Sequence, residues 1–371
     1  MLRDMNNAIY IDNETQLREF CSQLAGSPWL ALDTEFVREK TYYPKLCLLQ
    51  ISNGEHLACI DPLAIGDLEP LFELLYNPAI TKVWHACSQD LEIFAHLRGE
   101  IPAPLFDTQL AASLLGHGNQ ISYAALVKEL CGVELDKSHS RTDWSRRPLS
   151  EEQLTYAIDD VRYLCDVYEK LRKELDASGR GEWLDEDFSR LTHAPHYLVD
   201  MQNVWQQVKG LEILEGVQVA ILQALAAWRE QRAQKSDKPR RWIMSDEQLL
   251  ALAQADPQEV SDLSATGLSD KACDRFGNDL LLLMRQARAT PEEQWPIILY
   301  RDRPTPEEKQ LGKDLMKAVK EAAAEYAIDP ALLATRKTLN ALIAGQRDLP
   351  VLQGWRKQII GEDLLKIIEG N

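Results

Sequence analysis

Several kinds of segment are missing from this chain of 371 residues. No apolar run approaches the roughly 18 residues that a membrane helix needs, and residues 1–7 lack the apolar core of a secretory signal. The seven cysteines are odd in number and include no Cys-x-x-Cys pair, which argues against a disulfide framework and a zinc site. We therefore expect reduced, mostly buried thiols, a cytoplasmic location and no membrane partner.

Basic charge is also scarce. The formal net charge is −17; residues 1–200 hold 33 acidic and 18 basic side chains, and the remainder holds 25 and 23. A broad basic surface of the kind that binds nucleic acid is therefore not expected. Local clusters matter more than the sum because solution screens charges beyond about 8–10 Å. Two clusters could contact a phosphate backbone: Lys137, Arg141, Arg146 and Arg147, and later Lys235, Lys238, Arg240 and Arg241 beside Trp242.

The first 175 or so residues have the pattern of an α/β domain. Apolar runs at 29–32, 47–52 and 57–60 predict an antiparallel trio of strands, with Asn53-Gly54 as the turn between the last two. A buried strand is predicted at 82–85. With the helices between them, these strands predict an α/β sandwich around a mixed sheet.

Helix starts are marked by capping residues. Ser88 is predicted to cap the helix that follows the strand at 82–85, and Asp107 to cap a helix that ends near residue 115. Ser150 and Gln153 form a capping box, which predicts a long helix that runs to about residue 175.

The strand pattern ends after about residue 176, and two small all-α domains are expected at 211–288 and 289–371. Each contains a long helix, an Asp/Pro turn and then a leucine-rich helix, which indicates a weak internal duplication. Two unrelated helical packings explain the periodicity almost as well. Residues 1–200 form the remaining domain.

Asp33 and Glu35 lie at alternate positions directly after the apolar run at 29–32. Positions i and i+2 of a strand point to one face, so the two carboxylates are expected side by side on a buried base. Hard divalent cations prefer such oxygen ligands. For an isolated match, a solvated Asp-x-Glu at a strand end would be the better explanation.

Tyr156 and Asp160 are four residues apart and share one face of the predicted long helix. The apolar stripe of this helix lies roughly opposite, so both side chains are expected to face a cleft or solvent. A phenol beside a metal-bound carboxylate can orient an attacking water. A surface tyrosine with a helix-face aspartate is the simpler explanation for the pair alone, and Asp159 competes for the ligand role.

Asp90 is predicted to lie in the first turn of a helix, where aspartate usually complements the helix dipole. His85 fits a packed core histidine better than a metal ligand, because no second histidine keeps ligand spacing with it. Each of these signals is weak by itself.

The order of these motifs resembles the DEDD superfamily of 3′–5′ exonucleases, in its tyrosine-bearing branch. The match to the third motif selects Asp160 over Asp159. The segment 137–160, with Asp143-Trp144-Ser145-Arg146-Arg147-Pro148-Leu149, looks like ribonuclease D and its eukaryotic exosome relatives. The matching residues are Asp33 and Glu35 in the first motif, Asp90 in the second, and Tyr156 and Asp160 in the third.

The two helical regions resemble the helicase-and-RNase-D C-terminal (HRDC) domain. The first does so through Trp228-Arg229, Asp237 and Pro239, and the second, more divergent one through Gly354-Trp355-Arg356. An exonuclease domain followed by two such modules is the arrangement of bacterial members of the ribonuclease D family.

This resemblance implies a ribonuclease H-like mixed-sheet domain and two helical domains. It implies two divalent metal ions, Mg²⁺ or Mn²⁺, and no organic cofactor. Tyr156 would align the attacking water. The implied reaction removes extra 3′ nucleotides from structured RNA such as precursor tRNA and releases 5′-mononucleotides; a monomer is favoured. The implied metal ligands are Asp33, Glu35, Asp90 and Asp160.

Two alternatives remain at this point. A DNA-directed exonuclease of the same superfamily has the same catalytic motifs. A non-catalytic nucleic-acid-binding scaffold on an inactivated nuclease fold is a different class of protein. The intact set of four carboxylates and one tyrosine argues against the scaffold, because a scaffold would tolerate their loss.

Overall fold

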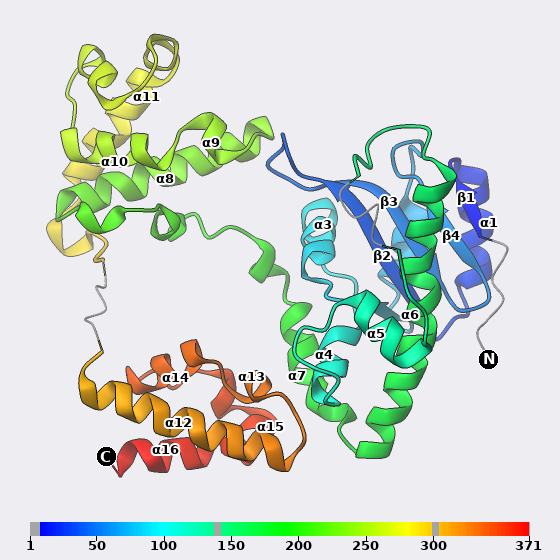
Figure 1. Cartoon of the computed structure of the whole chain (residues 1–371). Helices are drawn as coiled ribbons and strands as arrows, with labels where there is room; N and C mark the ends of the chain where they lie inside the picture. Colours follow the sequence, from blue (N-terminus) through cyan, green and yellow to red (C-terminus); the bar gives the residue numbers. More distant parts are fainter. Residues whose placement is uncertain (1–7, 137–141, 299–303, 371) are drawn as a thin grey trace. The chain divides into compact units, whose positions relative to one another are not determined.

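The computed structural model describes residues 8–136, 142–298 and 304–370 (Figure 1). The chain divides into two compact units. One contains Met1–Val37, Leu46–Tyr197 and Arg303–Asn371, and the other contains Arg38–Lys45 and Leu198–Asp302. Among the described residues, no helix combines the length and the apolar character needed to cross a bilayer.

The first unit contains a six-stranded mixed sheet in the order β1-β4-β3-β2-β5-β6. Strands β2, β5 and β6 pair in parallel, as do β1 and β4, whereas β3 and β4 are antiparallel across the Asn53-Gly54 turn. The predicted mixed sheet is therefore confirmed. The strands are β1 (Ile9–Ile11), β2 (Trp29–Val37), β3 (Lys45–Ser52), β4 (Leu57–Ile60), β5 (Thr81–Trp84) and β6 (Leu105–Asp107).

Helices cover both faces of this sheet (Figure 1). Leu30 and Leu32 of β2 pack in one core with α1–α3, while Ala31, between them, packs in a second core with α4–α6. This alternation follows from the two-residue period of a strand. The helices are α1 (Glu14–Leu24), α2 (Glu69–Leu75), α3 (Ser88–Arg98), α4 (Thr108–Leu114), α5 (Tyr123–Cys131) and α6 (Glu151–Ser178).

Two of the three predicted caps are confirmed. The Asp107 carboxylate accepts hydrogen bonds from the backbone N–H groups of Gln109 and Leu110 in the first turn of α4, and Ser150 and Gln153 form the capping box of α6. The prediction for Ser88 is wrong by one residue, because α3 begins at Ser88 and Cys87 occupies the N-cap. The Asp107 carboxylate accepts hydrogen bonds from the N–H groups of Ala86 and Cys87, and so orders the start of α3 from a neighbouring strand.

The C-terminal half contains two helical segments with the same order of elements. In each, a helix of 20 residues is followed by a helix of four residues and then by a helix capped by Ser245 or Thr335. The duplication itself stays a prediction. After α7 (Asp185–Leu191), the helices are α8 (Val217–Ser236), α9 (Arg240–Ile243), α10 (Asp246–Ala255), α11 (Asp270–Ala289), α12 (Pro306–Glu325), α13 (Pro330–Leu333), α14 (Arg336–Ile343), α15 (Gly354–Arg356) and α16 (Glu362–Glu369).

The two helical segments are packed differently. The first has a separate core built from α8, α10 and α11. The second shares one continuous core with α4–α6, in which Leu315 and Val319 cluster with residues of α6. At this junction Trp183 stacks on Trp355 with ring centroids 4.7 Å apart, and Arg356 forms an ion pair of 2.8 Å with Asp187. Residues 306–369 thus stabilise the exonuclease domain directly.

Candidate active site

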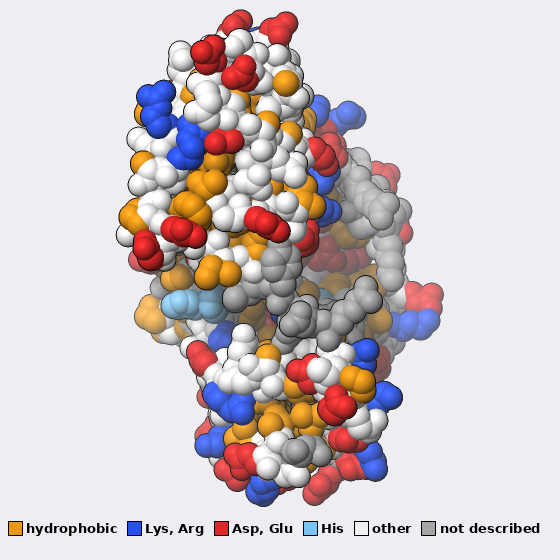
Figure 2. All heavy atoms as spheres, turned by 90° about the vertical axis from the view of Figure 1, so that its left-hand side faces the viewer, with side chains coloured by type: hydrophobic (Ala, Val, Ile, Leu, Met, Phe, Trp, Pro, Cys, Tyr) orange, Lys and Arg blue, Asp and Glu red, His pale blue; other side chains and the backbone are white. Residues whose placement is uncertain are grey.

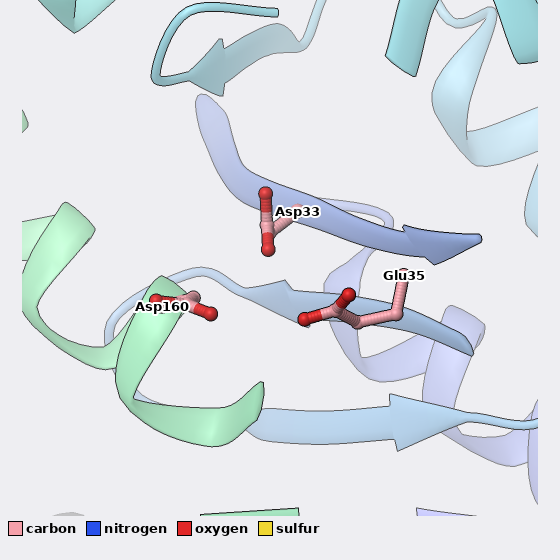
Figure 3. A group of neighbouring side chains, drawn as sticks. All are labelled: Asp33, Glu35 and Asp160. Carbon is pink, nitrogen blue, oxygen red and sulfur yellow. The ribbon is translucent and has the colours of Figure 1, made fainter. Parts of the chain in front are cut away.

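Three carboxylates converge where β2 passes the third turn of α6. One oxygen from each of Asp33, Glu35 and Asp160 lies within 4.8 Å of the other two. Figure 3 shows the side chains of β2 and that of α6 pointing toward one another. Segments far apart in the sequence therefore build one acidic site, as the first and third motifs predicted.

Strand alternation explains why Asp33 and Glu35 share this site. Ala31, two residues before Asp33, packs on the α6 side of the sheet, so the side chains at 33 and 35 face the same helix. On α6, Ala157 and Val161 are buried against the sheet side, which places Asp160 at the edge of the contact. Both elements are anchored by core residues, so the carboxylates are held on rigid backbone.

Burial and mutual repulsion make the carboxylates hard to ionise. Burial, followed by the charges of Asp160, Asp90 and Glu35, holds the pKa of Asp33 well above its ordinary value. Burial and the charges of Asp160 and Asp90 raise the pKa of Glu35 to about 9. Burial and Asp159 raise the pKa of Asp160 to about 7. Like charges cannot gather in a dry site without a counter-charge, and an all-oxygen donor set suits a hard divalent cation.

Asp90 approaches the site from the opposite side of β2. The hydroxyl of Thr34 donates to its Oδ1, and α3, which carries Asp90, packs on the face to which Thr34 points. Asp90 is outside the group of ligand atoms within 4.8 Å. Burial raises its pKa to about 7 against the opposing hydrogen bond from Thr34. The sequence analysis gave Thr34 no role. Its position between Asp33 and Glu35, which turns its side chain to the opposite face of β2, was the signal that could have identified it.

Tyr156 lies one helical turn before Asp160 and borders the cluster. Burial and the charges of Asp160, Glu35 and Asp33 raise the pKa of its phenol, so the hydroxyl keeps its proton at neutral pH. Its ring packs against the buried ring of Trp144, with centroids 6.1 Å apart. Tyr156 and Asp160 also line a pocket of about 530 Å³ with Asp136. The predicted cleft beside this helix face is therefore present.

Asp159 and His85 have other partners. Asp159 forms an ion pair of 3.0 Å with Arg162 and is not part of the carboxylate group. His85 contacts the Thr108 hydroxyl at 2.9 Å and the carbonyl oxygen of Ile121 at 3.0 Å. Burial lowers its pKa. His85 is thus a packed, hydrogen-bonded histidine, as its sequence context indicated.

The first basic cluster is only partly open to a ligand. Lys137 and Arg141 lie outside the described residues. Arg146 is 83% exposed and pairs with Asp143 at 3.2 Å. Arg147 instead turns inward, and its guanidinium group is 2.5 Å from the buried carboxylate of Asp61. Of this cluster's described members, Arg146 alone therefore presents a guanidinium group that is mostly exposed.

The second basic cluster is divided between a pocket and a buried ion pair. Lys235, Lys238 and Trp242 line a pocket of about 310 Å³, and Trp242 is 61% exposed. Arg240 instead contacts the fully buried carboxylate of Glu230 at 2.6 Å. Arg241 is exposed.

The pocket has further members that the sequence clusters did not include. Arg232, Arg275 and Phe276 complete its cationic and aromatic lining, and the guanidinium groups of both arginines lie 5.0 Å from the Phe276 ring centroid. Arg232 is three residues before Lys235 on α8, a helical spacing that could have identified it. On the face drawn in Figure 2, basic side chains stand in small groups among acidic ones.

The mixed sheet and the carboxylates that converge on it fit the class of 3′–5′ exonucleases. A family described as 3′–5′ exonuclease matches residues 8–176, and the HRDC domain matches residues 218–283. Ribonuclease D of Sphingobium indicum is 40% identical over 97% of this chain and 94% of its own length. Ribonuclease D of Zymomonas mobilis is also 40% identical, with 97% and 94% covered. The chain belongs to the ribonuclease D family.

Solved structures agree with this assignment. The crystal structure of Escherichia coli RNase D matches with a TM-score of 0.88 and 35% identity, over 98% of this chain and 99% of that one. The catalytic core of RRP6 from Trypanosoma brucei is 22% identical with a TM-score of 0.59 over 78% of this chain and 84% of its own, and shows the shared fold. The protein is therefore a 3′–5′ exoribonuclease of the DEDD superfamily. This conclusion replaces the alternative of a non-catalytic scaffold.

Proposed function

We propose that this exoribonuclease holds two divalent cations, Mg²⁺ or Mn²⁺, and trims extra nucleotides from the 3′ ends of structured RNA such as precursor tRNA. The convergence of Asp33, Glu35 and Asp160 within 4.8 Å carries the metal part of this proposal. The similarity to Escherichia coli RNase D, an exoribonuclease involved in structured RNA processing, supports the substrate class. We place the enzyme in the cytoplasm as a monomer.

Each residue has a distinct task in the proposed mechanism. Asp33, Glu35 and Asp160 would hold the cations from one side, and Asp90, which approaches from the α3 face, would complete the second position through water. The bound cations would neutralise the carboxylates and stabilise charge on the reacting phosphodiester. Tyr156, whose raised pKa keeps the phenol protonated, would accept or donate one hydrogen bond to fix the direction of the attacking water. The products are a 5′-mononucleotide and a new 3′-hydroxyl.

We further propose that the pocket on the first helical segment contacts the RNA body. Lys235, Lys238 and Arg232 would bind phosphate, and the exposed ring of Trp242 could stack on an unpaired base. Exposed Arg146 and Arg241 are candidates for further phosphate contacts. Arg147 and Arg240 are held by buried carboxylates, so we no longer assign them to RNA. Residues 289–371 are proposed to be a second, divergent HRDC-like domain.

A matched pair of substrates tests this function. Full-length protein is incubated with a 3′-extended precursor tRNA and with a DNA oligomer that has the same 3′ sequence, in Mg²⁺, in Mn²⁺ and in a chelator. We expect stepwise shortening of the RNA from its 3′ end, release of 5′-mononucleotides and no activity in the chelator. Full activity in the chelator would overturn the metal assignment. Preference for the DNA oligomer would favour the DNA-directed alternative.

A further inference from the structure

The guanidinium group of Arg147 uses all of its hydrogen-bonding capacity inside the protein. Its Nε and Nη2 donate to the two carboxylate oxygens of Asp61, at 2.5 and 2.7 Å. Nη1 donates to the carbonyl oxygens of Trp144 and Arg146, both at 2.8 Å, and Nη2 also donates to that of Cys47 at 2.6 Å. A guanidinium has five N–H donors in a fixed plane. All five have partners here, so no donor is left for a phosphate.

Asp61 gives this interaction a rigid base. It directly follows β4, and its residue is 1% exposed. Its carboxylate also accepts from the hydroxyl of Tyr10 at 2.5 Å and from the N–H of Leu63 at 2.9 Å. Burial acts to raise the pKa of Asp61, but the hydrogen bonds from Arg147 and Tyr10 outweigh it and the pKa lies below its usual value. A bidentate, charge-assisted pair of this kind fixes geometry as well as charge.

The segment fixed by Arg147 leads directly into α6, the helix that carries Tyr156. Arg147 donates to the carbonyl oxygen of Trp144, a residue that is 2% exposed and packs with Cys47, Cys59 and Ala157. Tyr156 packs against the same cluster, and its ring centroid is 6.1 Å from that of Trp144. The Trp144 side chain, which packs against the phenol ring, is therefore attached to the sheet through Arg147 and Asp61.

We propose that Arg147 and Asp61 are positioning residues for the exonuclease reaction, which anchor the segment 143–149 to the sheet so that Trp144 holds the phenol of Tyr156 where it can orient the attacking water. The assignment rests on the water-orienting role proposed above for Tyr156. It gives the basic pair Arg146-Arg147 two different tasks: the first side chain faces solvent and the second faces the core. A misplacement of about 1 Å in a positioning group can cost roughly 10²-fold in rate.

A double-mutant cycle tests this coupling in the full-length protein. kcat and KM for a 3′-extended RNA are measured for Arg147→Lys, Tyr156→Phe and the double variant. Lysine keeps the charge but cannot form the bidentate pair. We expect Arg147→Lys to lower kcat by about 10²-fold in the native background and by less than about threefold when Tyr156 is already phenylalanine, because residues that act as a unit are non-additive. KM stays unchanged.

A matched control removes the same kind of interaction elsewhere in the domain. Arg98 binds Glu69 through two guanidinium nitrogens at 2.7 and 3.0 Å on the surface, so Arg98→Lys should leave kcat unchanged. If Arg147→Lys does not fold by circular dichroism, Tyr10→Phe and Asp61→Asn enter the same cycle as milder changes to the same network.

The outcomes separate this inference from the proposed function. Full additivity with Tyr156→Phe, or a change in KM alone, would show that Arg147 does not act through Tyr156 and would overturn the inference while the metal site stands. Unchanged activity of Tyr156→Phe would remove the proposed role of the phenol and this inference with it.

Discussion

The carboxylate site and the basic pocket of the first helical segment hold side chains of opposite charge in different surroundings. The site gathers buried carboxylates that repel one another and whose pKa values are raised. The pocket gathers cations that are largely exposed and rest on aromatic rings. The first arrangement needs a counter-charge in order to ionise, whereas the second is already solvated. We therefore expect turnover to be lost outright when a carboxylate of the site is changed. We expect RNA binding to weaken gradually, and in a salt-sensitive way, when cations of the pocket are removed.

The largest effect is expected from removal of one carboxylate charge. Asp33→Asn keeps the shape of the side chain and removes a proposed metal ligand, so turnover should fall to background while the circular dichroism spectrum stays unchanged. Near-normal cleavage of RNA by Asp33→Asn would refute the metal assignment. Asp185→Asn, which changes an aspartate of α7 outside the site, is the matched control and should retain activity.

Removal of the Tyr156 hydroxyl should have the next largest effect. Tyr156→Phe is expected to lower kcat by ~10²–10⁴-fold, the range for a positioned proton-transfer or orienting group. RNA affinity should barely change, because the ring and its packing against Trp144 remain. Weaker RNA binding at normal kcat would instead identify Tyr156 as a packing or base-stacking residue.

The pocket should respond in a graded manner. Lys235→Gln with Lys238→Gln removes two cations that could neutralise phosphates, and the removal of each should reduce the salt slope of binding by about 0.7 on single-stranded RNA. The measurement is the affinity for a single-stranded RNA across a salt series. Lys309→Gln with Lys313→Gln changes two exposed lysines of α12 and serves as the control. Equal slopes for both double variants would show that the pocket does not touch RNA.

The smallest effect concerns stability without metal. The pKa of Glu35 is raised to about 9 from an ordinary value of 4.5, so between these pH values the folded state binds more protons than the unfolded state. The contribution of Glu35 to stability therefore falls as the pH rises through this window. In a chelator, Glu35→Gln should raise Tm more at pH 8 than at pH 5, by about 2–4 °C for each kcal/mol. A Tm of Glu35→Gln below that of the wild type at pH 8 would contradict this prediction. The same gain in Tm from Glu39→Gln would also contradict it.

The comparison also shows which features a sequence can supply. The strand run before Asp33, the capping box at Ser150 and the helical spacing of Tyr156 and Asp160 are local patterns, and the structure places each as predicted. The convergence of these residues could be predicted only from the order of the motifs, because no local pattern indicates that β2 and α6 are neighbours.

Interactions between distant segments were not predictable in this way. The cluster Arg146-Arg147 looks uniform in sequence, yet a carboxylate 86 residues away binds the Arg147 guanidinium and leaves that side chain 25% exposed, against 83% for Arg146. Arg240, which stays 37% exposed, is similarly paired with the buried carboxylate of Glu230. The predicted Ser88 cap of α3 was wrong by one residue, and the backbone N–H groups of Ala86 and Cys87, just before the helix, donate instead to Asp107 of β6. Rules based on local charge and capping cannot identify partners that come from distant segments.

Calorimetric titration of Mn²⁺ into the full-length protein tests the central claim most directly. Wild-type protein and Asp33→Asn are titrated near pH 7 in two buffers of different ionisation enthalpy, without RNA. Because the carboxylates have raised pKa values, the wild-type protein should bind Mn²⁺ with release of protons to the buffer, and Asp33→Asn should show neither the binding nor the release. Equal binding and equal proton release by both proteins would contradict a metal site at Asp33, Glu35 and Asp160.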